Sequence, residues 1–312
     1  MKYFDLPCDT ISECHDRRVG LRHNDLHWSL ERAGIFQPAA QVFAIFVHDR
    51  FRKEAAADRF DALYGTFVEQ MKENAGAIAF CRTGGELQTA FQDGKAAAVL
   101  SIEGGGALGG QIENLRKAYD KGVRILTLTW NGRCELGDGV GATDPDAGGL
   151  TLFGLDVVRE MERLGMVVDV SHLSQAGFRD VAAHSTRPFI ASHSNSKAVC
   201  AHRRNLTDRQ FAEIVRRGGL VGINLCRNFL TEDGNAAMMT DILRHVEHFL
   251  SLGGEEVLAV GGDLDGSTLP DGFSGVQDLA RMYEELLRHF PQKTVDGIFF
   301  NNAARFFTHT LA

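Results

Sequence analysis

Short apolar runs that alternate with longer amphipathic stretches are the feature that most restricts how this chain can fold. Eight runs predict strands, and several are almost continuously apolar, which is typical of parallel strands buried on both faces. The predicted strands span residues 3–8, 41–47, 97–102, 124–129, 166–170, 188–192, 220–225 and 257–260.

Amphipathic stretches between these runs predict helices over 114–121, 152–164, 174–184, 207–217 and 239–252, with Ser174 and Thr207 where N-caps belong. Eight strands that alternate with helices indicate an α/β protein and favour a single (β/α)8 TIM-type barrel domain over residues 1–312. A doubly wound sheet has a similar alternation, so the number of strands alone does not decide between the two.

Ionisable residues at the ends of the predicted strands favour the barrel. Glu103, His172, His193 and Asp263 each follow an apolar run. The active sites of TIM barrels lie at the C-terminal ends of several different strands. Four such residues at four strand ends therefore predict a site at the mouth of a barrel.

The types of these residues predict a zinc centre. Neutral imidazole and carboxylate are common zinc ligands, so Glu103, His172 and His193 form a candidate set that leaves one position open. Zinc bound there would activate water for hydrolysis. A carboxylate that does not bind the metal can carry the proton to the leaving group, and Asp263 is the candidate, with Asp265 as the alternative.

Composition excludes several other classes of function. The formal net charge is −8 and no strongly basic segment occurs, which argues against nucleic-acid binding. No apolar run reaches the ~20 residues of a membrane span, and the N-terminal sequence lacks a secretory pattern. The six cysteines form no CxxC pair, so we expect reduced thiols and a cytoplasmic protein.

Six motifs, in order, resemble those of the membrane (renal-type) dipeptidase family of amidohydrolase-like barrels: FDLPCDT, LSIEGGG, LTLTWN, DVSHLS, ASHSNSKAVCAHRRNLTD and VGGDLDG. The resemblance implies a two-zinc centre, a small dipeptide-like substrate, often with a C-terminal D-residue, and a homodimer. It also implies that Glu103 bridges the metals, that His172 and His193 bind the second metal, that Arg204 receives the substrate carboxylate, and that Asp263 handles the proton.

The first strand departs from the family's His-x-Asp motif. Pro7 stands at the histidine position, and Asp9 remains as a candidate metal ligand. Cys8 lies between them and is expected to point away from the site, because side chains alternate along a strand. A His-x-Asp sequence also occurs at 23–25, but it follows the first strand in a polar stretch, and we interpret it as unrelated to the metal.

Trp130 is a second departure, because the family has a substrate-contacting histidine there. The tryptophan can still contact substrate and donate its N–H. Together the two departures predict one or two zinc ions per chain, with the site at Glu103, His172 and His193 favoured. The main hypothesis is a zinc-dependent dipeptidase-like hydrolase, and the alternative is a catalytically impaired or repurposed homologue that binds a small peptide or another amide.

Three weaker patterns remain. Gly104–Gly109 matches GxGxxG, which raises a nucleotide-binding module as an alternative, but the next predicted strand ends without the acidic residue that such a module needs. We interpret these glycines as letting the loop pass close to the metal site. His245 and His248 are expected on an exposed helix face. The polar cluster of His15, His23 and His27 is a further potential source of the missing ligand.

Overall fold

The computed structural model describes residues 1–142 and 148–311, and its main sheet is parallel. The strands are hydrogen-bonded in the order β8-β5-β4-β2-β1-β10-β9. Their bounds are β1 Tyr3–Cys8, β2 Ala39–Phe46, β4 Ala96–Glu103, β5 Val123–Thr127, β8 Val167–Asp169, β9 Val221–Ile223 and β10 Leu258–Val260.

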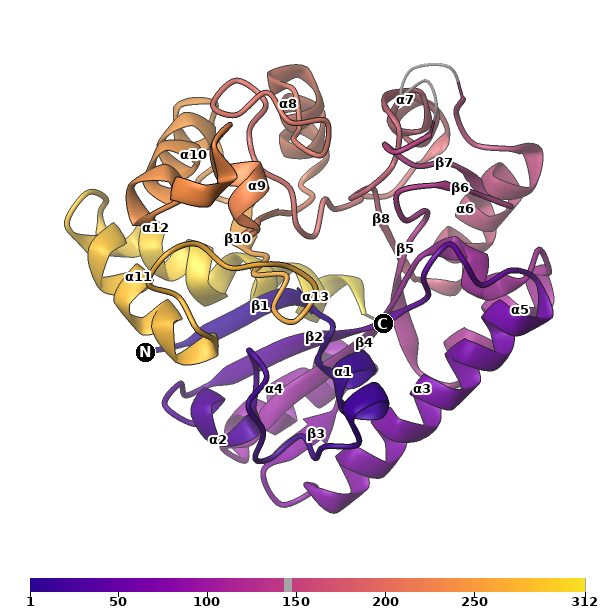
Figure 1. Cartoon of the computed structure of the whole chain (residues 1–312), viewed down its shortest axis with the longest axis horizontal. Helices are drawn as coiled ribbons and strands as arrows, with labels where there is room; N and C mark the ends of the chain where they lie inside the picture. Colours follow the sequence, from indigo (N-terminus) through magenta and orange to yellow (C-terminus); the bar gives the residue numbers. More distant parts are fainter. Residues whose placement is uncertain (143–147, 312) are drawn as a thin grey trace.

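Two isolated bridges close this sheet into a barrel. Ile190 pairs with Asp169 of β8, and Ala191 pairs with Val221 of β9, both in parallel. The predicted strand at 188–192 is therefore present only as these two bridges, yet it supplies the eighth segment of the ring. Helices surround the strands (Figure 1). The prediction of a (β/α)8 TIM-type barrel is confirmed.

The five predicted helices all form. They are α5 Ile112–Asp120, α6 Leu152–Leu164, α7 Gln175–His184, α8 Asp208–Arg217 and α10 Met239–Ser251. Ser174 and Thr207 are N-caps as predicted: the Ser174 hydroxyl accepts the Gly177 N–H, and the Thr207 hydroxyl accepts the Gln210 N–H.

Other elements were not predicted. Strand β3, Ile78–Phe80, adds to the N-terminal half of β4, and β6 (Arg133–Cys134) pairs with β7 (Gly137–Asp138) after β5. The additional helices are α1 Thr10–Arg17, α2 Leu30–Ala33, α3 Glu54–Glu73, α4 Gly84–Gln92, α9 Arg227–Leu230, α11 Leu279–Leu287, α12 Gln292–Asp296 and α13 Asn302–Thr310.

A compact apolar cluster fills the interior of the barrel. Each of the eight barrel segments contributes to it, and the side chains are Phe4, Leu6, Ala40, Val42, Ala97, Val99, Ile125, Val167, Ile190, Leu220 and Ala259. Helix α13 adds Phe306 and Phe307 to the same cluster. Because these residues lie toward the beginnings of the strands, α13 closes the N-terminal end and leaves the C-terminal end for polar groups.

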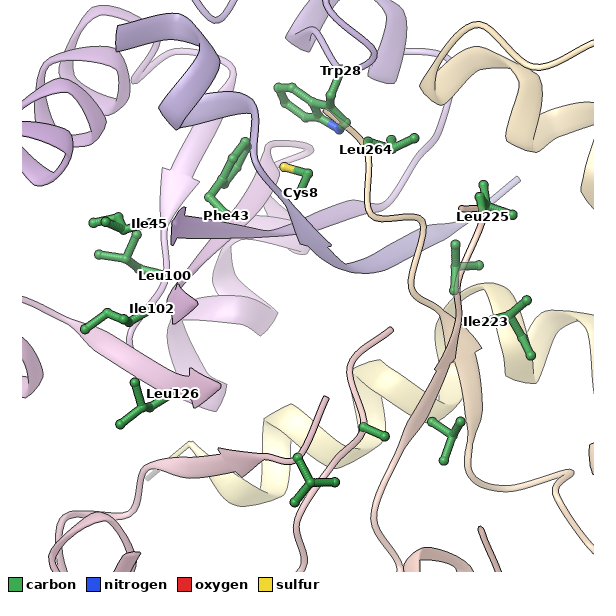
Figure 2. Close-up of a cluster of buried hydrophobic side chains, with 14 of the residues drawn as sticks. Cys8, Trp28, Phe43, Ile45, Leu100, Ile102, Leu126, Ile223, Leu225 and Leu264 are labelled. Atoms are coloured by element: carbon green, nitrogen blue, oxygen red, sulfur yellow. The ribbon is translucent and has the colours of Figure 1, made fainter. Parts of the chain in front are cut away.

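A bulge in β1 sets which residues face the interior. The pairing of β1 with β2 shifts between Asp5 and Pro7, so that Pro7 pairs with Val42 and Cys8 with Phe43. Val42 belongs to the interior cluster, whereas Cys8 and Phe43 pack with Trp28 in the layer between strands and helices (Figure 2). The expectation that Cys8 points away from the site is confirmed.

All six cysteines are buried, and none of them is paired in a disulfide. Within 1–142 and 148–311, no helix has both the length and the hydrophobicity needed to cross a bilayer.

Closure of the barrel by α13 generates a prediction about stability. Phe307 is fully buried, and its ring stacks on Phe4 at 5.3 Å between centroids. Phe307→Ala is expected to lower the free energy of unfolding by about 3–5 kcal/mol, measured by urea denaturation, because it leaves a cavity in a closed core. His309→Ala on the exposed side of α13 is the control, and an equal loss in both variants would contradict the assignment.

Candidate metal centre

Three predicted ligands meet at the C-terminal mouth of the barrel. Glu103 is the last residue of β4, His172 lies three residues beyond β8, and His193 follows the bridge at Ala191. All three are buried, and one potential ligand atom from each lies within 4.8 Å of the others. The structure thus brings together residues from three separate barrel segments.

The donor atoms of this group face one another at close range. His172 Nε2 lies 2.9 Å from His193 Nε2 and 3.2 Å from Glu103 Oε1. Zinc–nitrogen bonds of about 2.0–2.1 Å in a tetrahedral site place neighbouring donors about 3.3 Å apart. The separations in the structure are close to that value.

Hydrogen bonds behind the rings determine which nitrogens face the centre. His172 Nδ1 lies 2.9 Å from Asn131 Oδ1, which can only accept, so this nitrogen carries the proton. His193 Nδ1 lies 2.7 Å from the Ser192 hydroxyl, which itself donates to Asp169 at 2.5 Å and therefore accepts from the ring. Both Nε2 atoms consequently present lone pairs to each other.

The charge states agree with these tautomers. Burial, the Arg204 cation and the neighbouring ring lower the pKa of His172 well below its usual value. Burial and Arg204 do the same to the pKa of His193. At neutral pH both rings are therefore neutral, and no additional proton lies between the two Nε2 atoms. Two lone pairs and a carboxylate that converge in this way fit a divalent cation.

Carboxylates around the mouth raise one another's pKa. Burial raises the pKa of Glu103 well above its usual value, and Asp9 and Asp263 add to the increase, while Arg204 opposes it. Burial likewise raises the pKa of Asp9, with contributions from Asp263 and Asp265. The mouth therefore holds more negative charge than Arg204 alone can balance.

Asp9 is near the three-residue group but does not belong to it. A Cβ built on Gly266 would lie 2.4 Å from Asp263 Oδ1 and 3.0 Å from Asp9 Oδ2, so both carboxylates face one space. Pro7, by its register, occupies an inner-face position beside this space and carries no donor atom. The half of the site around Asp9 thus lacks a histidine from β1.

Asp263 and Asp265, the two candidates for proton transfer, differ in their surroundings. Asp265 accepts hydrogen bonds from the Thr10 hydroxyl and from the backbone N–H of His27, both at 2.5 Å, so it holds the segment around His27 in place. Asp263 accepts a longer 3.3 Å bond from Asn224, and a hydrogen bond from Ser267 also lowers its pKa. Burial raises the pKa of Asp263 to about 6, against the lowering effect of Arg204. Asp263 therefore has a carboxylate that remains available for exchange of a proton.

Backbone strain is concentrated at this mouth. Among the described residues, five non-glycine residues have positive φ, and His172, Asp263 and Asp265 are three of them, at 68°, 52° and 67°. Histidine and aspartate tolerate the left-handed region better than most side chains. Such conformations persist where the surroundings impose them, often at functional sites.

Arg204 is a buried cation beside the ligands. It is only 5% exposed, and Nη2 donates to the His193 carbonyl at 3.2 Å. Its Nε has no hydrogen-bond partner, and its guanidinium lies 5.3 Å from the Phe229 ring centroid. A buried guanidinium N–H without a partner is suited to receive an anion.

Trp130 lies at the rim in a small aromatic group. Its ring is 5.3 Å from Phe46, 4.7 Å from His48 and 6.2 Å from His172, measured between centroids. The tryptophan therefore occupies the side of the mouth above β2 and β5, next to one candidate ligand.

The remaining histidines lie outside the ligand group. His15 bonds to Thr66 and the exposed His23 to Glu31, while His27 contacts Asp265. The expectation for His245 was wrong: it is fully buried, accepts the Ser196 N–H, and bonds to the Leu230 carbonyl. His248 is partly exposed and pairs with Asp208.

The glycine-rich segment after β4 packs tightly against neighbouring strands. A Cβ on Gly104 would approach the Val47 carbonyl to 2.8 Å, and one on Gly105 the Leu128 carbonyl to 2.4 Å. Gly104 also has a φ of 98°, which favours glycine. Close passage beside the ligand Glu103 explains these glycines without a nucleotide.

Sequence reasoning missed the residues that hold the two candidate histidine ligands in place. Asn131 lies in the LTLTWN motif, Asp169 in DVSH and Ser192 in ASHS, so all three were inside the motifs singled out for other residues. The signal that was available is that a histidine that binds metal usually donates its other ring N–H to a nearby acceptor, and all three side chains can accept a hydrogen bond.

The geometry predicts how zinc content responds to substitution. His172→Asn is expected to reduce zinc from about one ion per chain to a small fraction, because the shorter amide cannot reach the centre and asparagine tolerates the positive φ. Metal analysis after dialysis measures this change. His23→Asn is the matched control, and loss of zinc in that variant would instead point to the sequence at 23–25.

Comparisons with known proteins agree with this geometry. A relative from Klebsiella pneumoniae, described as "Uncharacterized protein in pqqA 5'region", is 36% identical over 240 residues, which is 74% of this chain and 89% of that protein. An amidohydrolase from Pseudomonas aeruginosa, 19% identical, shares the fold with a TM-score of 0.82 over 99% of this chain and 96% of its own.

Two metallopeptidase structures are more similar. Dipeptidase AC, of peptidase family M19, is 30% identical with a TM-score of 0.93, over 100% of this chain and 99% of its own. A Rhodobacter sphaeroides metallopeptidase, liganded with a phosphinate mimic of the dipeptide L-Ala-D-Ala, is 29% identical with a TM-score of 0.93 over 99% of each chain. The model of the membrane dipeptidase family (peptidase family M19) matches residues 1–311, and the chain belongs to that family.

Proposed function

We propose that this protein is a zinc-dependent dipeptidase that works as a single barrel domain with one tightly held metal ion. The observation that carries the proposal is the convergence of Glu103, His172 and His193, with the two imidazole Nε2 atoms 2.9 Å apart. Membership of a metallopeptidase family supports the same chemistry. A zinc ion in this set supplies a Lewis acid that polarises a carbonyl and lowers the pKa of water.

Arg204 selects the substrate in this proposal. Its unpartnered Nε and planar guanidinium suit the C-terminal carboxylate of a short peptide. Arg204 contacts the backbone of His193, which is one of the proposed metal ligands. An anion bound to Arg204 therefore lies next to the proposed metal set. An anion site next to a hydrolytic centre suits a short peptide such as a dipeptide, and the phosphinate dipeptide mimic in the Rhodobacter relative supports this class.

Asp263 moves the proton. Its carboxylate accepts a proton from the attacking water and passes it to the leaving amine. With a pKa raised to about 6, it is mostly ionised at neutral pH and still close enough in pKa to give the proton back. Trp130 contacts the substrate side chain from the rim and can donate its indole N–H.

A panel of L,L and L,D dipeptides tests the function. We expect chelator-sensitive hydrolysis of at least one class, with kcat/KM falling as the pH is lowered, because Asp263 must be ionised to accept a proton. Bound zinc is expected to place this fall below the pKa of about 6 that burial gives Asp263 in the metal-free protein. Asp263→Asn is expected to lower kcat about 10²–10⁴-fold with zinc content unchanged.

The Asp263→Asn variant is expected to fold, because asparagine tolerates the positive φ of this position as well as aspartate does. Asp265→Asn is not a neutral control, since it breaks the loop contacts described above. Bound zinc without hydrolysis of any dipeptide would favour the alternative, an impaired or repurposed homologue, for which Pro7 and Trp130 are the motivating departures.

Pro7 generates a separate prediction. Pro7→His is expected to raise zinc above one ion per chain and to increase dipeptidase turnover, because position 7 faces the interior beside Asp9. Metal analysis and steady-state kinetics measure the two effects. If neither changes, the assignment of residue 7 to the missing ligand position is wrong.

A further inference from the structure

A buried hydrogen-bonded chain lies behind His193, outside the ligand group. It runs from the Asp169 carboxylate through the Ser192 hydroxyl to His193 Nδ1, with distances of 2.5 and 2.7 Å. All three residues are at most 4% exposed. Because burial keeps solvent from competing for these bonds, the direction of each proton is set by the protein.

The donors around Asp169 determine that direction. Oδ1 accepts the backbone N–H groups of Ser171 and Ser192 at 3.0 and 2.9 Å. Oδ2 accepts the hydroxyls of Ser192 and Thr127 at 2.5 and 2.6 Å. Four donors on two oxygens leave no place for a proton on the carboxyl group itself, so Ser192 must donate to Asp169.

We propose that Asp169 is a positioning residue that acts through Ser192 to hold His193 in the Nδ1–H tautomer, which keeps Nε2 free for the metal. Ser192 has one proton, and giving it to Asp169 obliges its oxygen to accept from the imidazole. The ring is thereby fixed in both tautomer and orientation. This inference rests on the proposed metal set, and it concerns metal affinity rather than the substrate.

His172 is held by a weaker arrangement. Its Nδ1 bonds directly to the neutral amide of Asn131, which stands on the segment after β5. The two imidazoles are therefore not equivalent: one is supported by a buried carboxylate relay and the other by a single amide. The relay makes His193 the more rigidly oriented of the two.

Asp169→Asn reverses the relay without changing its shape. The two backbone N–H groups hold the amide oxygen at the Oδ1 position, so Nδ2 takes the place of Oδ2 and donates to Ser192. Ser192 then donates to His193 Nδ1 at 2.7 Å in preference to the Ser171 hydroxyl, which is farther away at 3.4 Å, and the ring proton moves to Nε2. That nitrogen can no longer bind a metal without losing its proton.

The experiment measures zinc affinity by chelator competition and the His193 tautomer by imidazole ¹⁵N NMR of the metal-free protein. We expect Nδ1–H in the wild type and Nε2–H in Asp169→Asn, with zinc affinity lowered about 10–100-fold. Ser192→Ala is expected to lower the affinity by a similar factor. Ser194→Ala is the matched control, because this buried serine also adjoins His193 and makes no bond to its ring.

An Nε2–H tautomer in the wild type overturns the inference, even if Asp169→Asn does not fold. Unchanged zinc affinity in both Asp169→Asn and Ser192→Ala also overturns it, as does an equal loss in Ser194→Ala. If the wild type binds zinc but hydrolyses no dipeptide, the proposed substrate class fails while this inference stands. If the wild type binds no zinc, the proposed function fails and the NMR measurement alone decides the tautomer.

Discussion

Two imidazole nitrogens held 2.9 Å apart in a buried site, each with its lone pair toward the other, repel each other, and the surrounding structure has to hold them in that position. The rings cannot relax into a mutual hydrogen bond, because each already commits its proton to an acceptor behind it. They also cannot share an added proton, since burial and Arg204 lower both pKa values. A metal ion turns this repulsion into two bonds, so metal binding is expected to stabilise the fold as well as to provide chemistry.

The carboxylates around the mouth also repel one another, and a metal ion would relieve this repulsion as well. Asp9, Glu103 and Asp263 are three carboxylates beside one buried cation, Arg204, and burial disfavours their ionised forms. A divalent cation would balance the excess and allow all three to ionise. Arg204 would then be free to pair with a substrate anion instead of compensating for the carboxylates. Metal and substrate are thus coupled through charge, in addition to any direct contact between them.

The sequence was sufficient to predict the barrel and the convergence of the three candidate ligands, since both follow from local patterns. Strand β1 and helix α6 form over the predicted residues, and Glu103, His172 and His193 meet as expected. The pairing at Ile190 and Ala191 is only two bridges long, and β3 has three residues, so neither has a distinct periodicity of its own. His245 was misjudged because its partners, Ser196 and Leu230, are distant in sequence. Hydrogen-bonded relays such as the one from Asp169 require the tertiary structure, since Asp169 and Ser192 are far apart along the chain.

In the proposed assignment, Pro7 stands where a metal-binding histidine is missing, and the barrel allows this half of the site to change without the other. Proline has no N–H for a strand ladder, and β1 is a central strand between β2 and β10, so the bulge between Asp5 and Pro7 accommodates it. The change is confined to β1, whereas the three candidate ligands are supplied from β4 and from the segments after β8 and Ala191. Each barrel strand presents its terminal residues independently, because the interior cluster below fixes the strands whatever stands at their ends. On this proposal, the site around Asp9 can lack a histidine while Glu103, His172 and His193 keep a geometry that fits a single metal ion.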